Sequence, residues 1–408
     1  MPQQRTSAAP QVHVQPLTAA DLQPAWEVLE RAFGAAPNPD DAGVELGVVD
    51  PARFYAARLP DLDGDQVVGT AGSFAFSMSV PGAVLPVAGV TWVGVAATRR
   101  RRGVLGALME RQLADLHDEG TAVAALWASE AAIYGRYGYG PASWRLQLTL
   151  PHGAAFRSPV PVGDVRRVPP GCEEVRETYA RVAATSAGWP QRDARWWASA
   201  VHDPEHRRGG ASPLECVAVD GGYATYAVVV QWRDGLSASE VRVRELVART
   251  RTAHAQLWRF LLDLDLTAEV TAGVALDDPL LLDLLAEPRV ARAALRDGLH
   301  VRLVDVAAAL AGRRYAAELD LVLAVEDPRC PWNTGSWHLS GGRDGASCEP
   351  TTAEPHLSLP VVDLGAAYLG GTPLRSRGGV VELVPGALAR ATTAFGPLDG
   401  APSNPLVF

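Results

Sequence analysis

Alternating hydrophobic and polar residues predict a series of β-strands in the first 150 residues of the chain. Residues 12–17 and 144–150 each alternate along a short strand, and residues 122–128 form an apolar run typical of a buried strand. Residues 67–80 and 84–95 predict two longer strands, because a turn-forming Pro-Gly pair separates them. The pattern therefore indicates a central sheet.

Apolar residues also recur every three or four positions in two segments, which is the spacing of one helical face. The first stripe consists of Leu22, Trp26, Leu29 and Phe33, and the second of Leu105, Leu108, Met109, Leu113 and Leu116. With strands before and after each stripe, this part of the chain is predicted to be mixed α/β, with a helix covering each face of its sheet.

The same order of strand and helix returns in the middle of the chain. A proline-rich segment at 157–171 marks a boundary. Beyond it, residues 223–230 and 241–247 predict strands, and an apolar stripe over 257–264 predicts a helix. We interpret this as a second copy of the first fold that has lost its phosphate site, since the turn 248–256 contains no glycine.

After Asp297-Gly298 the pattern changes to short elements. Residues 305–313 predict a helix and residues 317–325 a strand, and two short helices near 361–368 and 385–393 follow a region rich in Gly, Ser and Cys. A third, α+β unit is therefore expected. The predicted domains are residues 1–155, 156–297 and 298–408.

The composition disfavours several classes of protein. The net charge of −9 argues against nucleic acid as a partner and favours cationic ones. No apolar run reaches the roughly 20 residues of a membrane span, and the N-terminal sequence lacks the apolar core of a secretory signal peptide. The four cysteines show no metal-ligand spacing, so we expect reduced thiols, a cytoplasmic protein and no membrane association.

Histidines give no metal site either. His202 and His206 have the spacing of neighbours on one helical face, but Pro204 lies between them and argues against a helix that aligns them. No third ligand is apparent in the sequence, so we predict no metal.

Residues 93–106, VGVAATRRRRGVLG, carry the clearest chemical signal. A buried strand runs into four arginines and a glycine, and a helix follows at once. Such a turn offers backbone N–H groups and the positive end of a helix dipole, which together bind a pyrophosphate. Gly103 lets the backbone approach the ligand closely. An arginine run before an amphipathic helix is also typical of a solvated basic face, so the motif alone leaves both interpretations open.

A longer match identifies a family. The pattern V-x-V-x(4)-R-R-R-G in its strand–helix context resembles motif A of the GNAT superfamily of N-acetyltransferases. Residues 125–142, ALWASEAAIYGRYGYGPA, look like the Eis (enhanced intracellular survival) acetyltransferases of actinobacteria, and the similarity continues through the middle region to the terminal Phe. The resemblance implies two GNAT-like units, the second degenerate, and a sterol-carrier-like C-terminal domain, in agreement with the segmentation above.

The resemblance also implies an acetyl-CoA site without a metal. By position it assigns acetyl-CoA binding to Val93, Gly94, Val95, Arg101, Arg102, Gly103, Val104, Leu105, Gly106, Ser129 and Glu130. The strand residues are expected to pair with the pantetheine amides, and the turn with the pyrophosphate. The sequence departs from the wider pattern at Leu105, where Gly or Ala is common, and at Ala131-Ala132, where a Gly pair is expected.

The resemblance further implies Tyr134 as general acid and the free carboxylate of Phe408 as general base. Direct transfer needs an unprotonated amine to attack the thioester and a proton for the departing thiolate. A tyrosine with a pKa of about 10 holds that proton at neutral pH, whereas a terminal carboxylate with a pKa of about 3.3–3.7 needs burial or a water relay to act as a base. Tyr137 and Tyr139 are rival acids by sequence, and we expect both to be structural.

The function predicted from this resemblance is N-acetylation of amines, with acetyl-CoA as co-substrate. The expected acceptors are small or polycationic amines, including aminoglycosides at more than one position, and the expected assembly is a homohexamer. Two alternatives remain open at this stage: a protein lysine acetyltransferase, and a non-catalytic protein that binds CoA or a lipid.

Overall fold

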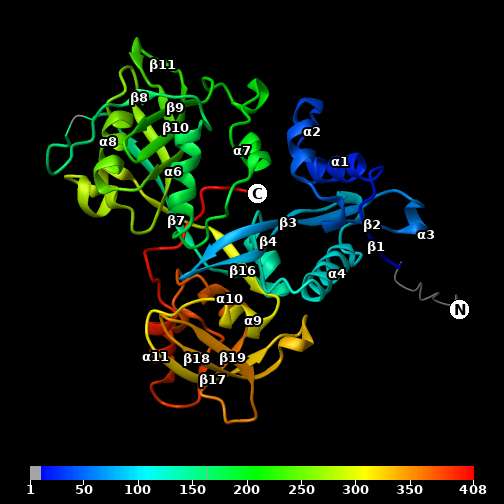
Figure 1. Ribbon diagram of the computed structural model, residues 1–408. Helices are drawn as coiled ribbons and strands as arrows, with labels where there is room; N and C mark the ends of the chain where they lie inside the picture. The colour runs from blue at the N-terminus through cyan, green and yellow to red at the C-terminus, as the bar shows by residue number, and fades with distance from the viewer. Residues whose placement is uncertain (1–10, 162) are drawn as a thin grey trace, which may run out of the picture.

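The computed structural model describes residues 11–161 and 163–408 of the chain. Within these residues the chain forms two seven-stranded sheets, a five-stranded sheet and a two-stranded hairpin. In Figure 1 the first sheet lies to the right, the second at the upper left and the third below them. None of the helices in the described part is long and apolar enough to cross a membrane.

The first sheet has the strand order β1-β2-β3-β4-β5-β16-β6. Its strands are β1 (His13–Pro16), β2 (Phe54–Arg58), β3 (Gly69–Val80), β4 (Ala83–Val95), β5 (Val123–Trp127), β16 (Leu299–Leu303) and β6 (Gly140–Pro141). Its helices are α1 (Leu22–Ala32), α2 (Pro39–Glu45), α3 (Pro60–Asp63), α4 (Val104–Asp118) and α5 (Ala131–Tyr134). Alternate residues of β2 pack with Trp26 of α1 or with Leu108 of α4, so these helices cover opposite faces as predicted.

The second sheet has the order β15-β7-β14-β13-β10-β9-β8. Its strands are β15 (Ala294–Asp297), β7 (Trp144–Pro151), β14 (Glu269–Ala275), β13 (Glu240–Ala248), β10 (Gly222–Val229), β9 (Glu215–Val219) and β8 (Arg166–Arg167). The helices of this unit are α6 (Glu173–Ala183), α7 (Ala194–Ala200) and α8 (Arg251–Leu262), and β11 (Trp232–Arg233) and β12 (Leu236–Ser237) form a hairpin at its edge.

The first two units exchange strands, which the sequence division did not anticipate. β7 precedes residue 155 but pairs with β14 and β15 of the second sheet. β16 follows residue 298 but pairs with β5 of the first sheet. Alternation along a strand identifies its buried face but not its partner, so the boundaries at 155 and 298 separate strands from the sheets that hold them.

The third unit contains β19 (Ala346–Pro350), β18 (Gly335–Gly341), β17 (Leu319–Glu326), β20 (Leu357–Pro360) and β21 (Val381–Glu382), with α9 (Val306–Ala311), α10 (Val361–Ala367) and α11 (Ala387–Ala394). α10 packs closely against the first sheet. A Cβ at Gly365 would lie 2.4 Å from the carbonyl oxygen of Val301, and one at Gly140 would lie 2.1 Å from that of Val362. Only glycine permits this approach.

A buried arginine joins two helices of the third unit. Arg313 is completely buried and donates hydrogen bonds to the carbonyl oxygens of Ala367, Tyr368 and Phe395. Its guanidinium carbon lies 4.7 Å from the centroid of the Tyr315 ring. The unit is thus held together by a charged side chain that satisfies the ends of two helices.

Candidate active site

A wedge opens in the first sheet between β4 and β5. The two strands are parallel, and in the described chain they pair only where Val87–Gly89 lies beside Val123–Ala125. Beyond Gly89 they diverge and border a cleft of about 850 Å³, a usual volume for a small-molecule site. Beyond Gly89, the edge of β4 that faces the wedge therefore has backbone N–H and C=O groups without a partner strand in the described chain.

The cleft gathers most of the residues that the sequence assigned to acetyl-CoA. These are Val93, Gly94, Val95, Arg101, Gly103, Val104, Leu105, Gly106, Ser129 and Glu130. Arg102 is exposed and does not belong to the described lining, whereas Arg99 and Arg100 do. A run of four arginines does not indicate which of them face a ligand. Phe33, which the sequence pattern did not indicate as a site residue, also lines the cleft from the end of α1.

A bulge in β4 shapes the cleft wall. Trp92 has a φ of 53°, and the pairing register with β3 shifts where Thr91 lies opposite Gly72 and Gly94 opposite Thr70. The Trp92 ring packs edge-on against the Phe54 ring, with 5.2 Å between the ring centroids. This packing stabilises the backbone conformation of the bulge. Such a bulge bends a strand and leaves a residue outside the ladder, here next to the wedge.

The turn before α4 is built to bind an anion. Arg101 has a φ of 61° and Gly103 a φ of 82°, so two left-handed residues precede the helix almost in succession. Gly103 is the N-cap of α4, and it has no side chain to occupy the N–H groups of the first turn. Such a turn forms a concave set of N–H donors at the positive end of the helix dipole.

Tyr134 ends the short helix α5 at the edge of the same cleft. Its side chain is only 6% exposed. Burial raises its pKa, and although a hydrogen bond with the Ser129 side chain acts in the opposite direction, the pKa of Tyr134 remains above its ordinary value. The Tyr134 hydroxyl therefore carries its proton at neutral pH.

The two neighbouring tyrosines differ in their access to the cleft. Tyr137 also lines it, with the guanidinium of Arg329 5.4 Å from its ring centroid. Tyr139 is 1% exposed and does not line the cleft as far as the described residues define it. Its ring packs edge-on against Tyr134 at 6.1 Å. This arrangement leaves Tyr134 and Tyr137 as the tyrosines within reach of a ligand.

The C-terminus of the chain lies at the narrow end of the wedge. The Phe408 ring packs against Phe76 of β3, with 4.9 Å between the ring centroids, and lies beside Gly89. The indole N–H of Trp127, the last residue of β5, donates to the carbonyl oxygen of Leu406 at 2.9 Å. The apolar tail is thus docked and attached to both strands of the wedge.

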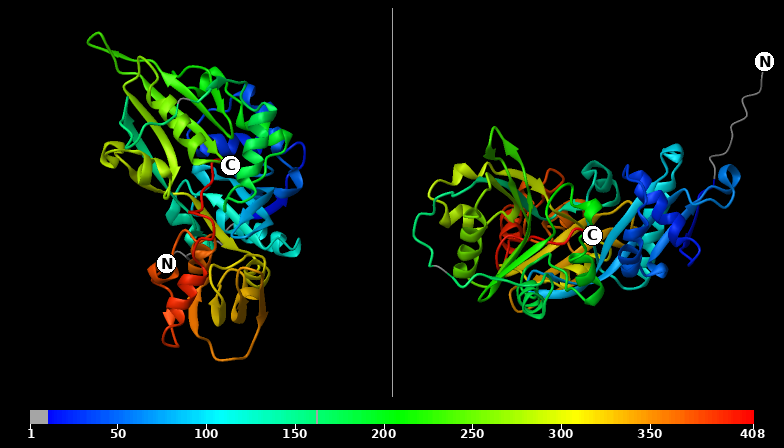
Figure 2. Two further views of the ribbon diagram at one scale, coloured as in Figure 1. Left: turned by 60° about the vertical axis from the view of Figure 1, so that its left-hand side comes forward. Right: turned by 90° about the horizontal axis from the view of Figure 1, so that it is seen from above.

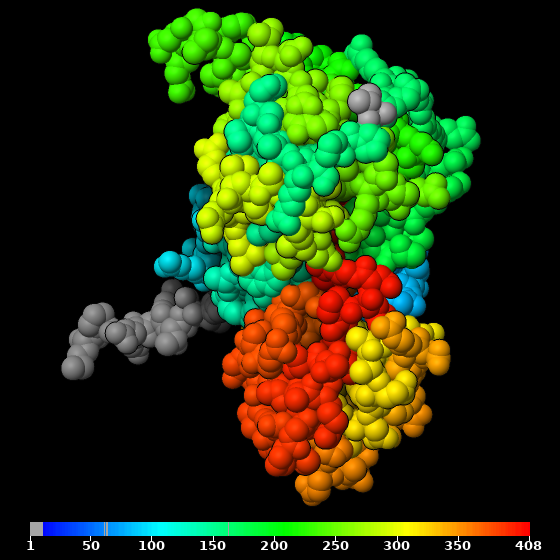
Figure 3. All heavy atoms as spheres, turned by 90° about the vertical axis from the view of Figure 1, so that its left-hand side faces the viewer, coloured from blue at the N-terminus to red at the C-terminus, as the bar shows by residue number. Residues whose placement is uncertain are grey.

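The tail reaches this position along the second unit. In Figure 2 it rises as a red segment from the third unit to the C-terminus between the other two units. The indole N–H of Trp189 donates to the Ser403 hydroxyl at 3.0 Å, and the Ser403 N–H donates to the carbonyl oxygen of Ala187 at 3.1 Å. Figure 3 shows the last segment emerging between the upper and lower lobes.

The second sheet repeats the wedge without its anion-binding turn. β13 and β14 are parallel and pair over Glu240–Arg242 and Glu269–Thr271 before they separate. Thr250 caps α8, and its hydroxyl accepts the N–H of Ala253 at 3.1 Å. The side chain of the protein itself therefore takes up a donor that a phosphate would need.

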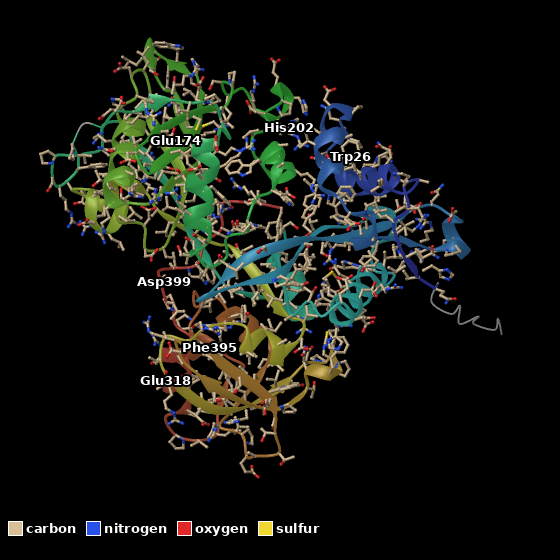
Figure 4. All side chains as sticks on the ribbon, viewed as in Figure 1. Trp26, Glu174, His202, Glu318, Phe395 and Asp399 are labelled. Atoms are coloured by element: carbon tan, nitrogen blue, oxygen red, sulfur yellow. The ribbon has the colours of Figure 1, made fainter. Side chains whose placement is uncertain are left out.

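A polar contact that the sequence did not indicate joins the first and second units. As Pro204 predicts, no α-helix spans His202 and His206. Nε2 of His202 lies 3.3 Å, and Nε2 of His206 2.9 Å, from the carboxylate of Asp41 in α2. Arg207 donates to Asp41 at 2.8 Å and also pairs with Glu45. Figure 4 labels His202 on the side of the second unit that faces α1 and α2. The segment needs no helix to bring both histidines to one carboxylate.

Three family models match the chain in succession. Residues 13–142 and 188–303 each match a model described as an acetyltransferase (GNAT) domain, and residues 306–402 match a sterol carrier protein domain. The second of these matches extends to residue 303 and so includes β16, although β16 forms its hydrogen bonds with β5 of the first sheet.

Whole-chain relatives agree with these models. An uncharacterized N-acetyltransferase of Streptomyces avermitilis is 48% identical over 385 residues, which cover 91% of this chain and 93% of that protein. The N-acetyltransferase Eis of Mycobacterium tuberculosis is 37% identical over 359 residues, covering 85% of this chain and 82% of that one. The chain belongs to the Eis family of N-acetyltransferases. The crystal structure of Eis1 from Mycobacterium abscessus superposes with a TM-score of 0.82 at 31% identity, over 97% of this chain and 100% of that one.

Membership of the Eis family confirms the predicted fold class, with two GNAT-like units and a sterol-carrier-like unit, and identifies the protein as an N-acetyltransferase. Among the described residues, no group of three or more His, Cys, Asp or Glu side chains is arranged to hold a metal ion. The wedge of the first unit is therefore the candidate active site of this Eis-family enzyme.

Proposed function

We propose that this Eis-family protein transfers an acetyl group directly from acetyl-CoA to amine acceptors in the wedge of the first unit. One observation carries the proposal: an anion-binding turn, an unpaired strand edge, a buried tyrosine and the end of the chain all meet at this wedge. Direct transfer needs a donor site, an acid and a base in one place.

The donor has a complementary site along the cleft. The backbone edge at Val93–Val95 pairs with the pantetheine amides, and the turn at Arg101 and Gly103 receives the pyrophosphate. Arg100 and Arg101 are exposed at this turn, so they add positive charge without a desolvation cost. The same strand edge supplies a backbone N–H for the oxygen that becomes negative when the amine attacks the thioester carbon.

Tyr134 acts as the general acid. As the carbon–sulfur bond breaks, its hydroxyl gives a proton to the departing sulfur, and the raised pKa of Tyr134 keeps that proton available at neutral pH. The carboxylate of Phe408 receives the proton that the amine releases, directly or through a water. Phe408 enters from the opposite end of the wedge, so the acid and the base approach the reacting atoms from different sides.

The proposed acceptors are amines, aminoglycosides among them, because the family resemblance of the sequence implies them and the net charge of −9 favours cations. We also propose a cytoplasmic homohexamer on the ground of that resemblance. The third unit serves as a scaffold for the tail rather than as a lipid carrier, because its core is filled by its own buried side chains and Arg313 joins the ends of two of its helices.

The test is acetyl-CoA-dependent thiol release by protein with a free C-terminus, with aminoglycosides, polyamines and lysine peptides as acceptors. Turnover on aminoglycosides that Tyr134→Phe abolishes supports both the activity and the role of Tyr134. Turnover only on lysine peptides moves the assignment to protein acetylation. Acetyl-CoA binding without turnover on any acceptor contradicts the proposal.

A further inference from the structure

Two cavities flank the C-terminal tail inside the second unit. One, of about 390 Å³, opens between β13 and β14, where the strands of the second sheet separate. The other, of about 280 Å³, lies toward α7. Arg145, Arg244 and Glu245 line both cavities, as do Pro405 and Val407 of the tail. The tail and these three charged residues therefore form a shared wall.

The acidic residue of this wall is already neutralised. Glu245 forms an ion pair of 2.6 Å with Arg192, and their side chains are 9% and 2% exposed. The hydroxyl of Tyr223 donates to the same carboxylate. Two further carboxylates line the larger cavity, and both have partners. Glu240 pairs with Arg242 at 2.9 Å, and the Asp278 carboxylate lies 3.1 Å from Nε2 of His254.

Arg145 and Arg244 have no such partner. Among the side chains that the structure describes, neither has a carboxylate within 4 Å. The guanidinium of Arg145 lies over the ring of Trp127, with 5.0 Å between its central carbon and the centroid, and its buried Nε has no described acceptor. Arg244 donates one long hydrogen bond, 3.5 Å, to the carbonyl oxygen of His202.

The surroundings of Arg244 make its charge costly. The Arg244 side chain borders the two cavities and is accessible from them. Protein atoms nevertheless surround much of the guanidinium and replace part of its hydration shell. Burial lowers the pKa of Arg244, although Asp203 and Glu245 act in the opposite direction. An unpaired guanidinium with reduced hydration favours an anion, above all one with two oxygens that match its geometry.

We infer that these cavities bind a small organic anion, with a carboxylate or phosphate between Arg145 and Arg244 and a flat apolar body in the larger cavity. Trp127 and Trp144, both half-buried, supply aromatic surface for that body. A volume of about 390 Å³ suits a molecule of one or two rings. This site goes beyond acetyl transfer, and its occupancy does not depend on acetyl-CoA or an amine.

The test is isothermal titration calorimetry on the full chain without acetyl-CoA, with three probes: indole-3-acetate, its uncharged analogue tryptophol, and inorganic phosphate. Indole-3-acetate is expected to bind with a Kd below about 1 mM. Arg244→Gln and Arg145→Gln should each weaken it about tenfold, the usual cost of one charge-assisted hydrogen bond. The control is Arg233→Gln, an exposed arginine of the β11–β12 hairpin that lines neither cavity, which should leave binding unchanged.

The outcomes separate the parts of the inference. Phosphate binding that depends on both arginines, without binding of indole-3-acetate, supports the anion site and assigns it to phosphate compounds. Equal binding of tryptophol and indole-3-acetate, or equal binding by the wild type and both arginine variants, overturns the site. Absence of binding by all three probes overturns it as well. Arg244→Gln changes an exposed side chain, so its result holds even if Arg145→Gln lowers stability.

Discussion

The ring of Phe408 lies against Gly89, the last residue of β4 that pairs with β5. A Cβ at Gly89 would lie 3.1 Å from the Phe408 ring and 2.2 Å from the ring of Phe76. The sheet therefore has a glycine at the point where the strands begin to separate, and the Phe76 ring, with the Phe408 ring beside it, occupies the space that a side chain would fill. This relationship places the last residue of the chain at the narrow end of the wedge.

The first prediction concerns the chain end. Two alanines added after Phe408 should reduce kcat at least about tenfold, because they move the carboxylate away from the position that the Phe408 ring fixes. The affinity for acetyl-CoA should stay within about twofold, since Phe408 does not line the described donor cleft. Steady-state kinetics check this, with the same two residues added at the N-terminus as control. Full activity of the extended protein contradicts the role of Phe408.

The second prediction concerns the acid. Tyr134→Phe should lower kcat by about 10²-fold or more while the Kd of acetyl-CoA changes little. Tyr137→Phe is the matched control, because Tyr137 lines the same cleft. Burial raises the pKa of Tyr134, so the alkaline loss of wild-type activity should begin only above pH 10 or so. A larger loss in Tyr137→Phe than in Tyr134→Phe would reverse the assignment.

The third prediction separates backbone strain from ligand binding. Gly103 and Gly120 have φ angles of 82° and 74°, and a Cβ at either position would meet no atom within 4 Å. Gly103→Ala and Gly120→Ala should therefore each cost about 1 kcal/mol of stability. Only Gly103→Ala should raise the KM for acetyl-CoA several-fold, because its turn holds the N–H donors of the cleft. Denaturant unfolding and kinetics measure both effects, and an equal rise in KM in both variants contradicts the anion turn.

The fourth prediction concerns the contact between the first two units. Burial by itself raises the pKa of Asp41, but hydrogen bonds from His206, His202 and Arg207 outweigh it and lower the pKa below its ordinary value. The resulting stability is present above the unfolded pKa of about 3.9 and is lost as the pH falls through the lower folded pKa. Asp41→Asn should lower the free energy of unfolding by about 1–3 kcal/mol at pH 7. It should also reduce the loss of stability at low pH, which is the acid limb of the stability profile.

Urea unfolding from pH 3 to pH 7 measures this effect. Asp40→Asn, at the neighbouring exposed position of α2, is the control and should keep the wild-type profile. An unchanged acid limb in Asp41→Asn would show that the contact adds no stability.

The fifth prediction concerns the third unit. Arg313→Met should destabilise the protein by about 2–4 kcal/mol, because it removes the guanidinium donor of the buried Tyr368 and Phe395 carbonyl groups. Thermal unfolding measures the change, and Arg343→Met at an exposed turn is the control. If the variant is as stable as the wild type, the hydrogen bonds of Arg313 add no net stability over an apolar side chain at this position.

The sequence by itself determined the local elements that border the cleft of the first unit. The strand at Val93–Val95, the glycine turn and the helix after it are local features, since their hydrogen bonds and φ angles are set by neighbouring residues. The segment around Tyr134 is equally local, because one short helix carries the tyrosine to the end of β5. Local patterns suffice where the contacts are close in sequence.

Only the tertiary structure decided the relationships between distant segments. Three of these relationships join residues far apart in the chain. They are the exchange of β7 and β16 between sheets, the packing of Phe408 beside Gly89, and the hydrogen bond between Asp41 and His206. The fold also decided that Arg100 lines the cleft and that Arg102 does not belong to its described lining. A run of identical residues does not indicate which side chains point toward a ligand. Periodicity shows which face of an element is buried, but the packing of complementary surfaces selects its partner.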